Sequence, residues 1–354
     1  MAEPTRLPRP PRLSAIGTAF PGRRYLQSEI VELFRVTDPK ARQFFTNGFI
    51  HARNLVLPDP APDGAIPEET PSALYAKHQH HAVETGSLAV TRALAAAGLT
   101  TQDVDYIACV TSTGFLCPSL TAHLVRHLDL PPKVHRLDVV GMGCNAGLNT
   151  LQPVSAYCSG HPGSVGLLVC VEVCSAAYVV DEAIGTAVVN SLFGDGAACA
   201  VVTSGAEEQG GVALLDYESL MLPDHFDAMR FDFDGRKYAF SINRAIPKVL
   251  GAHVDQPVDA LLARNGLTRN DIRHWNIHSG GRKVIDAMIK TLGLTRHEVR
   301  HTDAVLYDHG NLSSGSFLFS LKRLYEEGVA QPGDPCMLIT MGPGSQIECC
   351  LGRF

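Results

Sequence analysis

Short apolar runs alternate with longer helical patterns along this chain of 354 residues, and that alternation limits the fold more than any other feature. The runs are rich in valine, isoleucine and leucine, which suits strands buried in a sheet. The longer patterns place apolar residues three and four positions apart, which is typical of helices that cover a sheet. Strands and helices that alternate in this way predict an α/β protein.

The positions of these elements can be read from the same patterns. The expected strands are 13–17, 106–111, 134–140, 165–171, 197–202, 212–217, 274–278, 337–340 and 347–351. The expected helices are 75–97, 120–128, 148–159, 184–192, 258–265, 282–292 and 316–327. No low-complexity segment or Pro/Gly/Ser linker of useful length separates them, and the length of the chain suits two domains or one duplicated fold.

The same order of elements occurs twice, which indicates a duplicated fold. In the first part, strand 106–111 ends at a Ser-Thr-Gly turn, a glycine turn around Cys144 follows, and 194–197 opens a hairpin. In the second part, strand 274–278 ends at a Ser-Gly-Gly turn, and a Gly-Asn turn and a Gly-Pro-Gly hairpin follow. The expected divisions are a flexible tail over 1–12, an N-terminal half over 13–205 and a C-terminal half over 206–354.

Composition argues against several classes of function. A formal net charge of -6, with lysine and arginine scattered along the chain, gives no general electrostatic reason to bind nucleic acid or an anionic membrane. Hydrophobic residues make up 45% and charged residues 19%, as in an ordinary protein with a large core. The Pro- and Arg-rich tail has no apolar segment, so we expect neither a signal peptide nor a membrane anchor there.

The ten cysteines fit a reduced, cytoplasmic protein better than a disulfide or metal framework. Several of them lie in or beside apolar runs, which suits packing residues with free thiols: Cys109, Cys170, Cys174, Cys199, Cys336 and Cys349. None of the close pairs has the repeated CxxC spacing of a zinc site, so we expect no metal.

Cys144 stands in a turn between an expected strand and an expected helix. Residues 138–150 read DVVGMGCNAGLNT, in which two glycines end the apolar run before a helical spacing resumes. Unpaired N–H groups in the first turn of a helix favour negative charge, so they lower a thiol's pKa and favour the nucleophilic thiolate. Most free cysteines are small buried hydrophobes, however, so this position alone leaves both interpretations open.

Two other turns supply groups that could act with this thiol. His278 ends an apolar strand and precedes two glycines, where a backbone can closely approach a ligand. Asn311 follows Gly310 in a turn that would otherwise be interpreted as a helix cap. Each segment is weak evidence by itself, since buried histidines and capping asparagines are common.

A thiol, an imidazole and a carboxamide at strand ends form a plausible catalytic set. Open α/β sheets build their sites at the carboxyl ends of strands. A histidine can hold a thiolate–imidazolium pair, and both histidine and asparagine can donate hydrogen bonds to a developing oxyanion. This set suits thioester chemistry, but the order Cys…His…Asn also occurs in papain-like hydrolases, so acyl transfer and hydrolysis both remain open.

Five motifs in this order resemble one known family over nearly the whole chain. They are GCNAG at 143–147, LFGDG at 192–196, IHSGG at 277–281, GNLSS at 310–314 and GPG at 342–344. The set is similar to the type III polyketide synthases, the chalcone-synthase-like acyltransferases of the thiolase fold. The resemblance implies a thiolase-like, duplicated, five-layer αβαβα fold, with the nucleophile in the first half and histidine and asparagine in the second.

The resemblance also implies roles for individual residues. Cys144 would carry the acyl chain, and His278 and Asn311 would bind the malonyl thioester carbonyl and stabilise the enolate formed on decarboxylation. Phe193 and Phe240 would be gatekeepers between the CoA tunnel and the cavity. The other expected substrate contacts are Ser112, Ala177, Ser313 and Met341 in the cavity, and Arg53 and Lys283 as partners of CoA phosphates.

Longer shared segments, such as 186–195 and 309–320, resemble a bacterial subgroup that works in antibiotic biosynthesis. Ser279 and Met341 depart from the plant pattern and fit that subgroup. It implies that four malonyl-CoA, one of them as starter, become a resorcinol-type CoA thioester without any separate cofactor. It further implies a homodimer, in which a loop near Phe115 reaches the partner's cavity, and leaves open whether a dehydratase or isomerase acts on the product.

Several alternatives stay open. Within the fold, the chain could use a different acyl-CoA starter or be a ketoacyl-acyl-carrier-protein synthase of the initiating type. That type usually has glutamine and alanine after the histidine, where this chain has Ser279 and Gly280. A thioester or peptide hydrolase and a non-catalytic CoA-binding relative belong to other classes, and the presence of all three catalytic residue types argues against the last.

Overall fold

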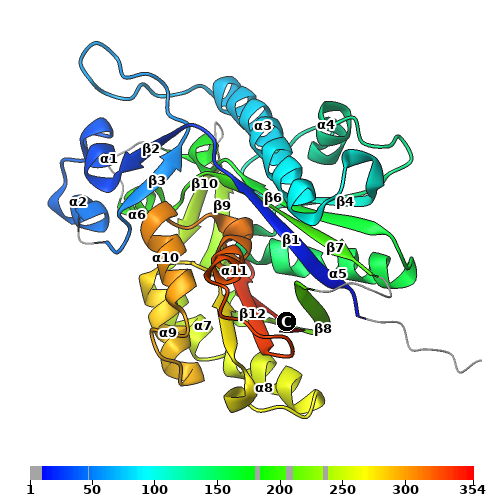
Figure 1. The fold of residues 1–354 in the computed structure, drawn as a ribbon. Helices are drawn as coiled ribbons and strands as arrows, with labels where there is room; N and C mark the ends of the chain where they lie inside the picture. The colour runs from blue at the N-terminus through cyan, green and yellow to red at the C-terminus, as the bar shows by residue number, and fades with distance from the viewer. Residues whose placement is uncertain (1–9, 47, 180–183, 205–209, 234–237) are drawn as a thin grey trace, which may run out of the picture.

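A nine-stranded sheet forms the centre of the molecule. The computed structural model describes residues 10–46, 48–179, 184–204, 210–233 and 238–354. The strand order is β11-β12-β13-β8-β1-β7-β6-β4-β5 (Figure 1). These strands are β1 (Arg12–Ala19), β4 (Val104–Thr111), β5 (His135–Val140), β6 (Val165–Glu172), β7 (Gly196–Thr203), β8 (Val212–Met221), β11 (His274–Ile277), β12 (Pro335–Gly342) and β13 (Gln346–Arg353). Two small sheets pair β2 (Arg23–Leu26) with β3 (Ala52–Leu55) and β9 (Met229–Phe233) with β10 (Tyr238–Ile242).

The helices cover and fill the space around this sheet. They are α1 (Gln27–Leu33), α2 (Pro39–Thr46), α3 (Pro71–Ala97), α4 (Leu120–His127), α5 (Ala146–Gly160), α6 (Ile184–Leu192), α7 (Ile246–Gly251), α8 (Asp255–Arg264), α9 (Arg282–Leu292), α10 (Arg300–His309) and α11 (Ser316–Glu327). Three short 3₁₀ turns matter for the site: η2 (Gly143–Asn145), η3 (Cys174–Ala177) and η6 (Ser313–Gly315). In the described part of the chain, no helix has the length and apolar character needed to span a membrane.

The two parts of the large sheet repeat one pattern of pairing. β1 and β6 each pair antiparallel with β7, and β6 pairs parallel with β4. In the same way, β8 and β12 pair antiparallel with β13, and β12 pairs parallel with β11. The parts join where Arg12 and Leu13 of β1 pair with β8. The duplication expected from the order of elements is therefore present in the backbone.

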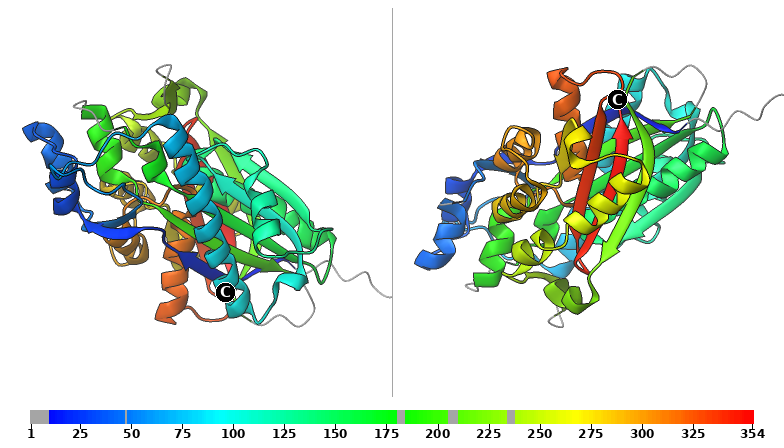
Figure 2. Two further views of the ribbon diagram at one scale, coloured as in Figure 1. Left: turned by 90° about the horizontal axis from the view of Figure 1, so that it is seen from above. Right: turned by 90° about the horizontal axis from the view of Figure 1, so that it is seen from below.

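The molecule has five layers, because side chains of neighbouring strand residues point to opposite faces of the sheet and pack against different helices. Leu168 of β6 packs in the cluster with α5 and α11, whereas its neighbour Val169 packs with α3. In the second half, Leu338 of β12 packs in the central cluster and its neighbour Met337 packs with α7, α8 and α9. Figure 2 shows α3 across one outer face and α8 across the other. The order helix, sheet, helix, sheet, helix confirms the expected αβαβα architecture.

Most elements were expected from the sequence, and a few boundaries need correction. All nine expected strands are the strands of the large sheet, and the seven expected helices form with slightly different ends. The expectation of a tail through residue 12 is wrong at Arg12, which already pairs with Thr203 and Ala213. The expected strand 274–278 ends at Ile277, so His278 begins the following loop. Residues 1–9 and the expected boundary at 205 lie outside the described residues.

Candidate active site

The turn that carries Cys144 is fixed by contacts with both halves. Gly143 has a left-handed φ of 73°, and its N–H donates to Ser112 Oγ at 2.8 Å. A Cβ on Gly143 would lie 2.5 Å from Cδ of Pro343, in the hairpin of the second half. Only glycine satisfies both conditions, because a side chain would clash there and strain the backbone. The glycine therefore lets the second half pack directly against the nucleophile's turn.

Cys144 is buried and faces two polar groups from the second half. Its thiol donates to Ser313 Oγ at 3.7 Å, and Asn311 Nδ2 donates to its sulfur at 3.9 Å. Burial raises the pKa of this thiol to about 12, although the hydrogen bonds from Ser313 and Asn311 act in the opposite direction. The expectation that the helix terminus would lower the pKa is therefore wrong for this structure, because desolvation of the thiolate outweighs the N–H groups.

Backbone pairing holds the Asn311 carboxamide in place. The backbone N–H of Asn311 donates to the Leu192 carbonyl at 2.9 Å, and the Gly194 N–H donates to the backbone carbonyl of Asn311 at 3.0 Å. Its Oδ1 accepts the N–H of Ser313 at 2.8 Å. Because the oxygen is occupied, the amide nitrogen is the end directed at the sulfur. The carboxamide is thus oriented as a donor, as an oxyanion or enolate would require.

His278 lies at the same end of the sheet. It follows β11, which runs parallel to β12, and the loop after β12 carries the Pro343 that contacts the Cys144 turn. Burial lowers the pKa of His278 to about 3, so its imidazole is neutral near pH 7. Its Nδ1 is buried and has no hydrogen-bond partner in the described ranges of the chain. No hydrogen bond between His278 and Cys144 occurs among the described residues.

A cavity opens beside Cys144, and the empty space within it and at its mouth, which includes open solvent, is about 420 Å³. Six of the expected site residues line it: Ser112, Cys144, Ala177, Phe193, Phe240 and Ser313. The Phe193 and Phe240 rings meet edge to face, with centroids 5.6 Å apart. The sequence did not indicate five further lining residues: Thr113, Cys174, Tyr178, Val189 and Phe231. The cavity is therefore mostly apolar and aromatic, with its polar groups gathered around the thiol.

Three expected contacts lie elsewhere. Met341 is buried in the cluster beneath α7, α8 and α9, because alternation along β12 turns it away from the Cys144 side. Arg53 has no exposed surface and bonds to Gln27, Tyr178 and Phe193, so it cannot meet a CoA phosphate at the protein surface. Lys283 is exposed in the first turn of α9, where it is free to approach solvent. The expectations for Met341 and Arg53 are corrected accordingly.

Glu172 is a buried carboxyl beside the thiol that the sequence analysis missed. It accepts hydrogen bonds from Ser112 N–H at 2.9 Å, Ser314 Oγ at 2.6 Å and Ser313 Oγ at 3.2 Å. Burial raises its pKa, and these donors act against that rise. An acidic residue directly after the apolar run 165–171 was the available signal, since a carboxyl is rarely buried without a purpose. Glu172 ties strands of the first half to the Ser313 turn of the second.

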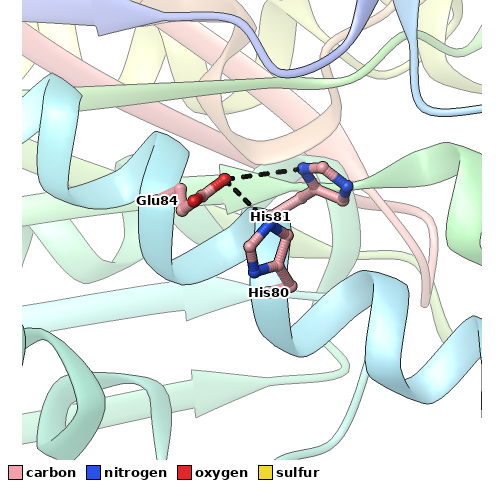
Figure 3. A group of neighbouring side chains, drawn as sticks. All are labelled: His80, His81 and Glu84. Atoms are coloured by element: carbon pink, nitrogen blue, oxygen red, sulfur yellow. Dashed lines mark ion pairs between the residues drawn. The ribbon is translucent and has the colours of Figure 1, made fainter.

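One group of metal-type ligands lies outside the cavity. His80, His81 and Glu84 are neighbours on α3, with His Nε2 and Nδ1 atoms 3.1 Å and 4.0 Å from the same Glu84 oxygen (Figure 3). It is the single such group found in the described part of the chain. None of its members lines the cavity beside Cys144. The group forms surface ion pairs, and nothing links it to the reaction centre.

Comparison with known proteins agrees with this fold and site. Residues 58–216 match the family described as FAE1/Type III polyketide synthase-like protein, and residues 262–354 match the 3-oxoacyl-[acyl-carrier-protein] synthase III C-terminal family. The chain is 49% identical over 342 residues to a 3,5-dihydroxyphenylacetyl-CoA synthase of Amycolatopsis balhimycina, covering 96% of this chain and 92% of that one. It is 47% identical over 362 residues to the enzyme of that name from Streptomyces toyocaensis, covering 100% and 93%.

A solved structure shows the same arrangement of elements. The crystal structure of 1,3,6,8-tetrahydroxynaphthalene synthase from Streptomyces coelicolor A3(2), a bacterial type III polyketide synthase, superposes with a TM-score of 0.89. The two sequences are 26% identical, and the match covers 96% of this chain and 98% of that one. The chain belongs to the type III polyketide synthases, as its motifs indicated. It is therefore an acyltransferase with a thiolase-like fold.

Proposed function

We propose that this enzyme condenses four molecules of malonyl-CoA on Cys144 and releases 3,5-dihydroxyphenylacetyl-CoA. The observation that carries this proposal is the 49% identity, across 96% of the chain, to a synthase of that product. The site supports it, because a buried thiol faces a carboxamide donor at the edge of an apolar cavity. Such a cavity suits a reactive polyketide chain that must be kept from water.

The first steps load the thiol and generate a carbon nucleophile. Cys144 loses its proton and attacks the starter thioester carbonyl, the bond from that carbonyl to the CoA sulfur breaks, and the departing CoA thiolate takes up the proton that Cys144 lost. An extender malonyl-CoA then loses CO2, and the electrons of the broken C–C bond form an enolate. The amide N–H of Asn311, which faces the sulfur at 3.9 Å, donates to the enolate oxygen. Neutral His278 would donate a second hydrogen bond to the same oxygen.

Condensation and ring closure complete the cycle. The enolate carbon attacks the acyl carbonyl on Cys144, the C–S bond breaks, and the lengthened chain remains on CoA until it is transferred back to the thiol. After three condensations, and once the starter unit has also lost its carboxylate as CO2, an aldol attack within the resulting eight-carbon chain closes the ring, and loss of water makes it aromatic. Four malonyl-CoA thus give one aromatic CoA thioester, four CO2, three CoA and one water. CoA thioesters are the substrates, and no separate cofactor takes part.

Other parts of the surface support the remaining proposals. Lys283 is exposed and would pair with a CoA phosphate. The edge strand β5 and the loop at Phe115, which is 72% exposed, would meet a second copy of the chain in a homodimer. The ten free thiols, nine of them buried, suit a reducing cytoplasm. A product released as a CoA thioester would be available to a later dehydratase or isomerase.

Incubation with malonyl-CoA as the sole substrate tests this function. Mass spectrometry should detect a dihydroxyphenylacetyl-CoA ester or its free acid, together with CO2, and Cys144→Ala should form neither. Persistence of malonyl-CoA, or a requirement for another acyl-CoA starter, would contradict the proposal. Malonyl-acyl-carrier protein offered in parallel tests the initiating ketoacyl synthase that the match over 262–354 favours. Preference for that extender would decide for the alternative.

A further inference from the structure

Arg53 is a buried cation beside the reaction centre, and the proposed reaction does not use it directly. It belongs to β3 and is 0% exposed, and it heads the largest side chains that are fully buried. Burial lowers the pKa of its guanidinium, which shows how strongly the interior disfavours the charge. A buried charge is a poor way to gain stability, because its desolvation cost commonly offsets the interactions it makes. Its contacts therefore need another explanation.

The guanidinium and the Tyr178 hydroxyl together hold the backbone carbonyl of Phe193. Arg53 Nη1 donates to the Phe193 carbonyl and, at 2.7 Å, to the Tyr178 hydroxyl, which donates to the same carbonyl. Arg53 Nε donates to Gln27 Oε1 at 2.9 Å, and Gln27 Nε2 donates to the Ser191 carbonyl at 2.8 Å. The network therefore fixes the end of α6 and the residue that follows it. Phe193 itself lines the cavity.

The aliphatic part of Arg53 packs on the residue before Asn311. A Cβ built on Gly310 would lie 2.7 Å from Arg53 Cδ and 3.0 Å from Cγ. Gly310 also has a left-handed φ of 72°, so the chain approaches the arginine where only glycine fits without strain. Phe193 and Asn311 form a parallel bridge with each other. Arg53 thus touches both sides of the pairing that places the cavity phenylalanine and the carboxamide.

No carboxylate neutralises this arginine directly among the described residues. The nearest acidic influence is Asp195, whose oxygens instead accept N–H groups of Val56 and Ser175, each at 2.8 Å. Within the part of the chain that the structure describes, Arg53 Nη2 is buried and has no hydrogen-bond partner. The charged guanidinium therefore donates its hydrogen bonds to a backbone carbonyl and to neutral side chains. The arrangement depends on the planar guanidinium, whose N–H donors point in fixed directions. A lysine ammonium cannot supply that geometry.

We infer that Arg53 is a positioning residue, which clamps the Phe193–Asn311 pairing and so holds the Asn311 carboxamide at the sulfur of Cys144. Its effect on catalysis rests on the proposed role of Asn311 in condensation, but its effect on the thiol does not. If the clamp is lost, the carboxamide no longer lies at 3.9 Å from the sulfur. A misplacement of about 1 Å at a reacting group can cost about 10²-fold in rate.

Two readouts on Arg53→Lys, Asn311→Ala and their double variant test this inference. In the first, kcat for malonyl-CoA consumption should fall about 10²-fold in Arg53→Lys, with KM changed less than about threefold. In the second, alkylation of Cys144 across pH 7 to 10 should slow about threefold in both single variants, because each loses a hydrogen bond that favours the thiolate. In both readouts the double variant should resemble Asn311→Ala alone, since Arg53 acts through Asn311.

Matched variants separate positioning from folding. Arg23→Lys lies on β2, which pairs with β3, and its side chain is 67% exposed, so it should leave both readouts unchanged. Tyr178→Phe removes one donor to the Phe193 carbonyl and should lower kcat by about threefold to tenfold. Effects of Arg53→Lys and Asn311→Ala that multiply, or an unchanged kcat and alkylation profile in folded Arg53→Lys, would overturn the inference. Wild-type enzyme that ignores malonyl-CoA would contradict the proposed function, while the alkylation profile would still decide the role of Arg53.

Discussion

The turn before α5 and the turn before α11 occupy equivalent places in the two halves, yet only one presents a nucleophile. Gly143 and Ser313 each begin a 3₁₀ turn with a left-handed φ, of 73° and 48° respectively. Cys144 and Ser314 follow them, and each turn runs directly into its helix. Cys144 faces the cavity, whereas the Ser314 hydroxyl donates to buried Glu172 at 2.6 Å. The same backbone arrangement thus presents the Cys144 thiol to the cavity in the first half and a hydroxyl to Glu172 in the second.

The first residue of each turn shows how the roles separated. At Gly143, Pro343 occupies the space that a side chain would need, so the turn packs directly against Pro343. At Ser313 a side chain is kept in a backbone region that costs a non-glycine residue about 1–2 kcal/mol. Its hydroxyl accepts from the Cys144 thiol and donates to Glu172, which offsets that cost. Ser313 of the second turn therefore contacts the thiol of the first turn directly.

Removing the two side chains in parallel should give the largest contrast between the turns. Cys144→Ala should lower condensation by at least about 10⁴-fold, because no other group can carry the acyl chain. Ser314→Ala should lower it by less than about tenfold, since it removes one hydrogen bond to Glu172. Radiolabelled malonyl-CoA turnover measures both. Comparable losses in the two variants would mean that the turns share the chemistry rather than divide it.

Adding a methyl group to the first turn should break its geometry. Gly143→Ala places a Cβ against Pro343 and strains a left-handed backbone, so the free energy of unfolding should fall by about 2–4 kcal/mol. Denaturant unfolding with circular dichroism measures the change. Gly185→Ala is a suitable control in α6, where a Cβ would meet no other described residue within 4 Å outside its own helix backbone. A stability of Gly143→Ala equal to that of the control would contradict the described packing.

The pH dependence of Cys144 alkylation should reveal how its surroundings set the pKa of the thiol. With a pKa raised to about 12, the thiolate fraction stays small at neutral pH and grows about tenfold with each pH unit below that value. Alkylation by iodoacetamide should therefore accelerate about 10²-fold from pH 7 to pH 9. Mass spectrometry of the Cys144 peptide isolates this residue from the other thiols. A plateau below pH 8 would instead show that His278 stabilises the thiolate as an ion pair.

Converting Ser313 to the residue used in the first turn should have the smallest effect. Ser313→Gly relieves the left-handed strain but removes the hydroxyl between Cys144 and Glu172, so stability should change by less than about 1 kcal/mol. Activity should fall by less than about tenfold, measured as kcat with malonyl-CoA. A loss as large as that of Cys144→Ala would mean that the hydroxyl takes part in the chemistry itself.

Much of the large sheet could be predicted because several of its strands are buried on both faces. All eight residues of β6 are buried, and such continuous apolar runs are easily recognised in a sequence. β2 and β3 escaped recognition because they contain charged residues, including the interior Arg53. α10 was missed because the segment around His309 was interpreted only as a turn. Local patterns therefore revealed the core and failed where polar residues enter it.

The site shows the same division between local and long-range information. Motifs around Cys144 and Asn311 predicted residues that the structure brings into contact. Glu172 and Tyr178 act through partners far away in the chain, and the one local signal, an acidic residue directly after the apolar run 165–171, does not tell what Glu172 contacts. Met341 was misplaced because a motif does not tell which face of β12 a side chain occupies. The raised pKa of Cys144 was missed for a related reason, since burial depends on the whole fold.

The most direct test of the account is where the acyl chain resides during turnover. The enzyme is quenched in acid a few milliseconds after mixing with malonyl-CoA, digested, and its cysteine peptides are examined by mass spectrometry. We expect malonyl- or acetyl-derived mass on the peptide containing Cys144, and none on it in Cys144→Ala. An acyl adduct on another cysteine, or turnover with every cysteine unmodified, would contradict the assignment of the first turn as the nucleophilic one.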